Sequence, residues 1–315
     1  MTDEALLIDV SDANLLRLST ARSRQRPEPS VVYPCRTLED FSRAIDAYLS
    51  TRPSRDLIGA AVCACGWEQD GGLAMPNDPF RVQRDWLRER LNIRRLNLVN
   101  DCVSVAMSVQ LLRGDETVKI CGDNGQAFQA KLLVGASVGL GSAMIISDDL
   151  NGDTVIPCEG GHSDLPAVTP RETAVLELMK QKFGRVSRER AVSLQGLAEI
   201  WRCLGVLDGV PAEPLTGAEV IDRVRSGDVR ARDTLDLCTG WLAAFASDGA
   251  LMCGARGGVY LAGTMIAMMH DLIDMELFTA RFQDKGRLRA YVADLPVHMI
   301  VAPEPAMLGL STLFS

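Results

Sequence analysis

The 315-residue sequence has no excess of positive charge. Lys and Arg number 33 against 41 Asp and Glu, which gives a formal charge of −8 at pH 7. A chain with this balance repels nucleic acid at long range, so we expect no nucleic-acid partner. The charge still permits a small phosphorylated ligand, because a few local amides can bind one phosphate whatever the net charge.

The sequence also lacks an apolar run long enough to cross a bilayer. The longest run, residues 132–146, is interrupted by three glycines and is shorter than the roughly 20 residues that a span requires. The first residues, Met1-Thr2-Asp3-Glu4, are acidic and lack the basic start of a signal peptide. We therefore expect a cytoplasmic protein with no membrane role.

The nine cysteines form neither a disulfide framework nor a zinc motif. They are scattered, odd in number and mostly set in apolar runs, which is typical of small buried residues in a reducing compartment. Cys63-Ala64-Cys65-Gly66 supplies only two of the four ligands of a closed zinc site, and no second pair lies at a useful spacing. We expect no bound zinc.

Short apolar segments alternate with amphipathic segments along the chain, without repeats or low-complexity stretches. This alternation predicts an α/β protein with mostly parallel sheets. The polar, basic and proline-containing segment 19–28 predicts a surface loop. We expect strands at residues 5–10, 57–64, 96–99, 131–135 and 257–263, and helices at residues 80–91, 103–112, 170–183, 218–224 and 231–252.

Motifs distributed over nearly the whole chain resemble those of bacterial glucokinases, and their order and spacing agree from about residue 5 to residue 313. The resemblance implies an α/β protein with the two-domain actin-like ATPase/hexokinase (ribonuclease H-like) fold and a cleft between the domains. It implies a small domain of residues 1–110, on which residues 300–315 pack back, and a large domain of residues 111–300. The motifs are Asn100-Asp101, Glu159-Gly160-Gly161-His162, Gly257-Gly258-Val259-Tyr260, Phe282-Gln283-Asp284-Lys285-Gly286-Arg287, Pro296-Val297 and residues 303–309.

The residues that match the sugar-binding motifs of the family are well preserved. The resemblance implies that Asp101 is the base that accepts the proton of the sugar 6-hydroxyl, and that Asn100 binds sugar hydroxyls through its amide. It also implies that Glu159, His162 and Glu189 bind the sugar. Carboxylates, an amide and an imidazole suit an uncharged polyol, because each donates or accepts a hydrogen bond in a fixed direction.

Each of these matches has an alternative interpretation. Asn100-Asp101 by itself is typical of a cap between a strand and a helix. His162 after two glycines is typical of a turn, and Glu189 stands among arginines as an exposed charge can. The functional interpretation is favoured because all five residues occur in the order and spacing of the family.

The nucleotide side departs from the family pattern. The resemblance implies ATP with Mg²⁺ as phosphoryl donor, bound by Asp9, Asn14, Gly135, Gly139, Gly141 and Gly263. The first phosphate loop of the family reads Asp-x-Gly-Gly-Thr-Asn, whereas this chain has Asp9-Val10-Ser11-Asp12-Ala13-Asn14. Glycine is needed in such a loop because the backbone must turn sharply and approach the phosphates closely.

These departures put the use of ATP and Mg²⁺ in doubt. A carboxylate of Asp12 about 4 Å from a phosphate charge would cost on the order of 4 kcal/mol at an effective dielectric constant of 20. A bridging Mg²⁺ would reverse that sign. In the second phosphate loop Ser137 adds a Cβ and Val138 replaces a hydroxyl, and Thr264 replaces a glycine of the adenosine motif.

Three functions therefore remain open. The first is ATP-dependent phosphorylation of glucose to glucose 6-phosphate. The second is a pseudokinase that binds glucose, has lost efficient use of ATP and acts as a sugar-binding or regulatory protein. The third is an enzyme of the same fold that uses another hexose or another donor, such as polyphosphate. The resemblance also implies a possible homodimer.

Overall fold

A computed structural model describes most of the chain, and the described residues fall into two units. The described residues are 3–11, 14–23, 25–52, 56–74, 81–123, 125–148, 152–210 and 213–314, without the side chains of residues 67, 68, 73 and 74. Unit 1 comprises Met1–Leu112 with Ala302–Ser315, and unit 2 comprises Arg113–Val301. The chain therefore leaves unit 1, builds unit 2 and returns to unit 1.

The main sheet of unit 1 has five strands in the order β3-β2-β1-β4-β8 among the described residues. The pairs β1–β4 and β4–β8 are parallel, and the pairs β1–β2 and β2–β3 are antiparallel. The expected strands at residues 5–10, 57–64 and 96–99 are confirmed. The strands are β1 (Glu4–Asp9), β2 (Leu15–Arg22), β3 (Val31–Pro34), β4 (Gly59–Ala64) and β8 (Leu96–Asn100).

Alternate side chains of β1 point to opposite faces of this sheet, and helices cover both faces. Leu6 and Ile8 share a core with α1 (Leu38–Ser50) and with Leu87 and Leu91 of α2 (Arg84–Leu91). Ala5 and Leu7 pack against α11 (Pro305–Ser311) and the 3₁₀ helix η6 (Thr312–Phe314). Helix α3 (Asp101–Ser108) follows β8 directly and continues as η1 (Val109–Leu111).

Two expectations for unit 1 are wrong. Residues 19–22, expected in a surface loop, belong to β2, and Ser19 and Thr20 are fully buried. The Ser19 hydroxyl donates to the Glu28 carbonyl (2.6 Å), so the buried polar group keeps a partner.

The expected helix 80–91 begins only at Arg84, because Val82–Gln83 form β7; residue 80 lies outside the described residues. A small antiparallel sheet contains β5 (Trp67–Gln69), β6 (Gly72–Ala74) and β7 (Val82–Gln83).

The described strands of unit 2 form a six-stranded sheet in the order β12-β11-β10-β13-β14-β9. The pairs β10–β13 and β13–β14 are parallel, and the other pairs are antiparallel. The expectation of mostly parallel sheets is therefore wrong, because short hairpins, which allow only antiparallel pairing, build one side of each large sheet. The strands are β9 (Thr117–Cys121), β10 (Lys131–Ala136), β11 (Leu140–Asp148), β12 (Gly152–Cys158), β13 (Gly258–Ala262) and β14 (Val297–Ile300).

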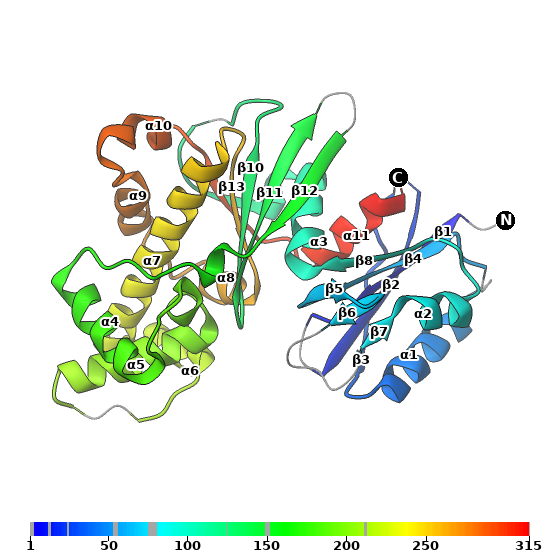
Figure 1. The fold of residues 1–315 in the computed structure, drawn as a ribbon, viewed down its shortest axis with the longest axis horizontal. Coiled ribbons are helices and arrows are strands. Elements are labelled where there is room, and N and C mark those ends of the chain that lie inside the picture. The colour runs from blue at the N-terminus through cyan, green and yellow to red at the C-terminus, as the bar shows by residue number, and fades with distance from the viewer. Residues whose placement is uncertain are drawn as a thin grey trace. The chain divides into compact units, whose positions relative to one another are not determined.

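Helices account for much of the rest of unit 2, with α7, yellow in Figure 1, packed against β10. The expected helix 170–183 is confirmed as α4, which begins after a capping box of Thr169 and Glu172. The helices are α4 (Pro170–Phe183), α5 (Leu194–Leu207), α6 (Gly217–Arg225), α7 (Val229–Cys253), α8 (Thr264–Met269), α9 (Met275–Gln283) and α10 (Arg289–Ala293). Short 3₁₀ helices are η2 (Gly114–Glu116), η3 (Gly160–His162), η4 (Arg188–Arg190) and η5 (Gly286–Leu288).

Candidate active site

Polar side chains gather where three neighbouring parallel strands of unit 1 end. Asp9 ends β1, Asn100 ends β8 and Asp101 begins the helix that follows. Between them β4 ends at Ala64. Because parallel strands end at the same edge of a sheet, chain segments far apart in sequence meet here, as they do at ligand sites of open α/β sheets.

Asn100 is the N-cap of α3, as the alternative interpretation of the sequence held. Its Oδ1 accepts from the Cys102 N–H (2.9 Å), and its Nδ2 donates to the Gly66 carbonyl (2.9 Å). The side chain thus ties the start of α3 to the segment that follows β4. One amide N–H and one lone pair of Oδ1 remain beyond these two bonds, so capping leaves capacity for a ligand.

Asp101 is half-buried at the start of α3. Its Oδ1 accepts from the same Cys102 N–H (2.9 Å). Burial raises the pKa of Asp101 to about 6, the charge of Asp9 acts in the same direction, and the Cys102 hydrogen bond opposes both. A carboxylate with a pKa near neutrality is suited to accept a proton from a hydroxyl.

Asp9 is buried and held by its own segment and by β2. Its Oδ1 accepts from the Ser11 N–H (2.9 Å) and from the Ser11 hydroxyl, and Arg17 lies 3.7 Å from Oδ2. Asn14 has a φ of 64°, so the chain turns sharply after this segment. The doubt about the first phosphate loop rests on Ser11 and on residues 12 and 13, of which the last two lie outside the described residues.

In unit 2, Glu159 and His162 lie at the two ends of a tight turn that contains η3. Their side chains are 83% and 59% exposed, and Glu159 Oε2 lies 3.8 Å from His162 Nε2. A Cβ on Gly161 would lie 1.9 Å from the Leu140 carbonyl oxygen, so only glycine allows this close packing against β11. The exposed side chains are therefore free for a ligand, while the backbone beneath them is fixed.

Glu189 lies beside the same strand, in η4. Its Oε2 accepts from the Leu140 N–H (3.0 Å), and a Cβ on Gly139 would lie 2.7 Å from that oxygen. The segments that contain η3 and η4 pair with each other, because the Arg188 N–H donates to the Ser163 carbonyl (2.9 Å). The structure thus brings the η3 turn and Glu189 together around the start of β11.

The second predicted phosphate loop is the hairpin between β10 and β11, in which Gly135 pairs with Gly141. Ser137, whose side chain was expected to disturb the loop, accepts from the Thr264 N–H at the start of α8 through Oγ (2.9 Å). A Cβ on Gly263 would lie 2.3 Å from the Ala136 carbonyl oxygen. Ser137 therefore joins the hairpin to the segment of the expected adenosine motif.

Sequence reasoning missed three groups that support these residues. Cys63 lies beside Asp9 and Ser104, and burial, together with the charge of Asp9, raises the pKa of this thiol well above its usual range. Arg188 and Asp248 form an ion pair of 2.8 Å next to η4. The apolar run around Cys63 predicted its burial, but no local pattern connects residues 188 and 248.

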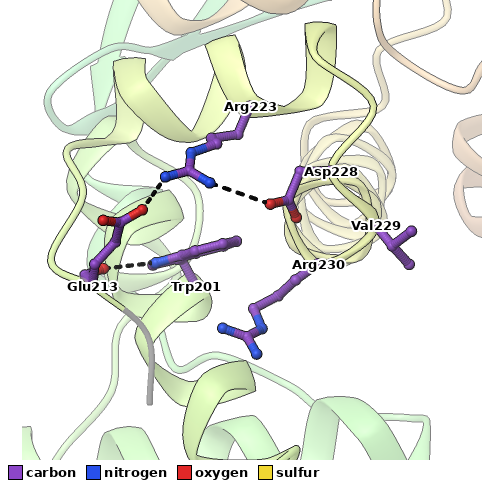
Figure 2. Close-up of a pocket in the computed structure, with 6 residues that line it drawn as sticks. All are labelled: Trp201, Glu213, Arg223, Asp228, Val229 and Arg230. Carbon is purple, nitrogen blue, oxygen red and sulfur yellow. Dashed lines mark hydrogen bonds and ion pairs between the residues drawn. The ribbon is translucent and has the colours of Figure 1, made fainter. Parts of the chain in front are cut away.

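A separate cavity of about 550 Å³ lies among α5, α6 and the start of α7 (Figure 2). Arg223 pairs with Glu213 and, at 3.6 Å, with Asp228, and the Arg230 guanidinium lies 5.1 Å from the Trp201 ring centre. These charges are largely matched by one another, and none of the predicted site residues lines the cavity, so we assign it no role in catalysis. The lining residues are Trp201, Glu213, Arg223, Asp228, Val229 and Arg230.

Two kinds of feature are absent from the part of the chain that the structure describes. It contains no cluster of three or more His, Cys, Asp or Glu side chains able to hold a metal ion. Among its helices, none combines the length and hydrophobicity that crossing a bilayer requires.

Comparisons with known proteins identify the family. The chain matches the family described as "Glucokinase" over residues 8–315. It is 36% identical to a glucokinase-like protein of Caulobacter vibrioides, covering 89% of this chain and 87% of that protein. It is 33% identical to the glucokinase of Pseudomonas paraeruginosa, covering 97% of this chain and 90% of that protein.

The fold agrees with this assignment. The structure of a glucokinase from an Antarctic psychrotroph matches with a TM-score of 0.87 at 22% identity, covering 100% of this chain and 99% of the other. The expected two-domain actin-like hexokinase fold is thereby confirmed. Because the sequence match extends over nearly the whole chain and the fold is the same, the chain belongs to the glucokinase family.

Proposed function

We propose that the chain transfers the γ-phosphoryl group of ATP to glucose, with glucose 6-phosphate as the product and Asp101 as the base. The observation that carries the proposal is the Asp101 carboxylate at the carboxyl edge of the parallel strands, with a pKa of about 6. Such a group is mostly ionised at neutral pH and still basic enough to take a proton from a positioned hydroxyl. We assign glucose as the sugar because the chain belongs to the glucokinase family.

In the proposed reaction the glucose 6-hydroxyl loses its proton to Asp101 while its oxygen attacks the γ-phosphorus. The bond between that phosphorus and the bridging oxygen of ADP breaks, and ADP leaves with the bonding electron pair. Positioning and charge stabilisation supply most of the rate enhancement in such transfers. The Cys102 N–H bonded to Asp101 orients the carboxylate for this step.

The proposed sugar ligands are Asn100, Glu159, His162 and Glu189. The exposed side chains of Glu159 and His162 offer an acceptor and an imidazole from one fixed turn. Glu189 uses Oε2 for the Leu140 N–H, which leaves its other oxygen for a sugar hydroxyl. This set suits an uncharged polyol and can distinguish epimers only through the placement of each partner.

On the nucleotide side we propose Asp9, Asn14, Gly135, Gly139, Gly141 and Gly263 as the groups nearest to ATP. Mg²⁺ typically binds through one or two carboxylates and the substrate phosphates, and Asp9 is a buried carboxylate at the end of β1 that suits this role. When bound, Mg²⁺ neutralises charge on the transferred phosphoryl group. The close approach at Gly263 keeps the backbone of β13 near the hairpin.

The test is titration calorimetry of the purified protein with glucose, with ATP·Mg²⁺ and with both, followed by a coupled assay for glucose 6-phosphate. We expect each ligand to bind, both to bind more tightly together, and product to form. Binding of neither ligand would contradict the assignment of glucose. Turnover with polyphosphate but not with ATP would change the assignment of the phosphoryl donor. Turnover with mannose but not with glucose would change the assignment of the sugar.

A second candidate is a pseudokinase that binds glucose without efficient transfer. It is favoured by the occupied amides near the second phosphate loop, since Ser137 Oγ accepts from Thr264 and Glu189 from Leu140. Glucose binding without any response to ATP would favour this candidate. The double variant Asp12→Gly/Ala13→Thr restores two of the three altered residues of the family loop, with Ser11 left in place, and should then increase ATP affinity. No increase would show that residues 12 and 13 are not the cause.

We also propose a cytoplasmic homodimer. None of the nine cysteines forms a disulfide, and a protein of this kind suits a reducing compartment. Sedimentation equilibrium will determine the mass in solution, and a monomer at all concentrations would contradict the dimer.

A further inference from the structure

Three charged side chains meet beneath the candidate sugar ligands of unit 2. Asp248 of α7 accepts from Arg188 of η4 (2.8 Å) through Oδ2 and pairs with Lys285 (2.8 Å) through Oδ1. The Arg188 guanidinium also lies over the Phe245 ring, 5.5 Å from its centre. We call these four residues, Arg188, Phe245, Asp248 and Lys285, the Asp248 cluster.

The charges of the Asp248 cluster are poorly hydrated. The side chains of Arg188 and Lys285 are only 13% and 14% exposed. Nε and Nη1 of Arg188 have no hydrogen-bond partner among the described residues. Buried ion pairs lose hydration and are often no more stabilising than apolar side chains of similar size. Stability alone therefore does not account for two buried cations around one carboxylate.

The Asp248 cluster contacts both segments that carry the candidate sugar ligands. Arg188 precedes Glu189 in η4, so its ion pair with α7 fixes the backbone from which Glu189 projects. On the same helix, the Phe245 ring would lie 3.1 Å from a Cβ on Gly160, within the turn that presents Glu159 and His162. One turn of α7 thus supports both segments.

Lys285 belongs to one of the glucokinase-like motifs, residues 282–287, that contains none of the candidate site residues. It lies in the stretch 282–287 of the C-terminal half, between α9 and η5. Phe282, at the end of α9, is fully buried in the core of unit 2 and brings the following residues to α7. The Lys285 ammonium then reaches the second oxygen of Asp248, so that both carboxylate oxygens are held in a fixed orientation.

We propose that the Asp248 cluster positions Glu189 and the η3 turn for sugar binding, with Asp248 as its central positioning residue. The proposal rests on the proposed function, because it takes glucose as the ligand of these segments. The Asp248 cluster does not touch the sugar. It acts by limiting the movement of Glu189 relative to Glu159 and His162, which must contact one small ligand together.

The test compares Asp248→Asn with Asp236→Asn. Asp236 lies on the same helix, is 31% exposed like Asp248 and also pairs with an arginine, Arg232, but that arginine bonds to the Leu272 carbonyl and belongs to neither segment. A small displacement of a binding group can weaken binding by one or two orders of magnitude, so we expect Asp248→Asn to raise the Kd and KM for glucose about tenfold. The KM for ATP·Mg²⁺ should stay unchanged, and Asp236→Asn should change neither constant.

Lys285→Met and Lys285→Arg provide a second comparison in case Asp248→Asn does not fold. The arginine variant keeps the cation and should bind glucose as the unsubstituted protein does, whereas the methionine variant should lose affinity. Unchanged glucose affinity in Asp248→Asn or Lys285→Met, even with a lower Tm, would show that the cluster only stabilises unit 2 and would overturn the proposal. Failure of the unsubstituted protein to bind glucose would instead overturn the proposed function, and this role with it.

Discussion

At the scale of single residues, the environment of the candidate base disfavours its ionised form. Asp101 ionises less readily than an ordinary aspartate because it is buried and close to Asp9. The same environment makes it a better proton acceptor at neutral pH. Catalytic capacity and local stability are thus opposed at this position.

We expect Asp101→Ala to abolish phosphoryl transfer and to keep the Kd for glucose within about tenfold, as when a base rather than a binding group is lost. Calorimetry gives the affinity, and the coupled assay gives the rate. Complete loss of glucose binding would mean that Asp101 holds the sugar more than it activates it.

The pKa of about 6 predicts a pH dependence of the rate. The base must be ionised, so kcat/KM should rise with pH up to about 6 and level off above it. The Asp101→Ala variant is the control, because it should show no transfer at any pH in this range. An inflection near the ordinary aspartate value of 3.8 would show that the carboxylate is well hydrated.

The same pKa predicts a stability effect of opposite sign. The folded-state pKa of Asp101 lies above the ordinary value of 3.8, so folding favours the protonated form. Its contribution to the free energy of unfolding should fall as pH rises from about 4 to 6 and remain low above that. Asp101→Asn should therefore raise Tm by about 2–4 °C at pH 8. At pH 4 the two proteins should melt together, and a lower Tm of the variant at pH 8 would contradict the effect of burial.

The sequence indicated most of the residues around this site but not their contacts. The local motif at Asn100 and Asp101 predicted a helix cap, which the structure confirms, whereas their assignment to the site came from the resemblance to glucokinases. The bonds from Ser137 to Thr264 and from Leu140 to Glu189 depend on loops that pack together only after folding. Such contacts leave no periodic signal in the sequence.

At the scale of helices and strands, close backbone approaches join the segments. A Cβ on Gly309 of α11 would lie 1.6 Å from the Ser104 carbonyl oxygen of α3. Helix α3 begins at Asp101, so this packing also supports the candidate base. The side chains of α11 cover the face of the sheet that contains Ala5 and Leu7.

We expect Gly309→Ala to force α11 away from α3 and to destabilise unit 1 by about 1–3 kcal/mol, the usual cost of overpacking. Gly114→Ala is the matched control, because a Cβ there meets no atom within 4 Å. Denaturant unfolding measures both variants. Equal stability of the two would show that α11 can shift without cost.

Elements were predicted best where a local signal marks their start. The helix at 170–183 has a proline at its start and is dense in Leu and Val, and its predicted bounds are those observed. Strand β2 was missed because its polar Ser19 and Thr20 are buried, and the bond from the Ser19 hydroxyl to the Glu28 carbonyl leaves no pattern in the sequence. The antiparallel hairpins were missed because strand direction follows from pairing, which the local composition does not encode.

At the scale of the whole molecule, the excess of acidic residues governs the behaviour in solution. The sequence has a pI of about 5.1 and a charge of −8 at pH 7. Mutual repulsion keeps the molecules apart at neutral pH and vanishes near the pI. We expect light scattering to show a solubility minimum near pH 5.1, and a minimum above pH 7 would contradict the charge balance.

Because the chain returns to unit 1, unit 1 cannot finish folding until synthesis on the ribosome has passed unit 2. Residues 4–9 of β1 emerge early, but α11, which covers one face of that strand, emerges only after all of unit 2. Unit 2 is one continuous segment and can bury its core while the nascent chain is still growing. Strand β1, made before unit 2, therefore belongs to the unit that is completed after unit 2, and until then its uncovered face is open to chaperones.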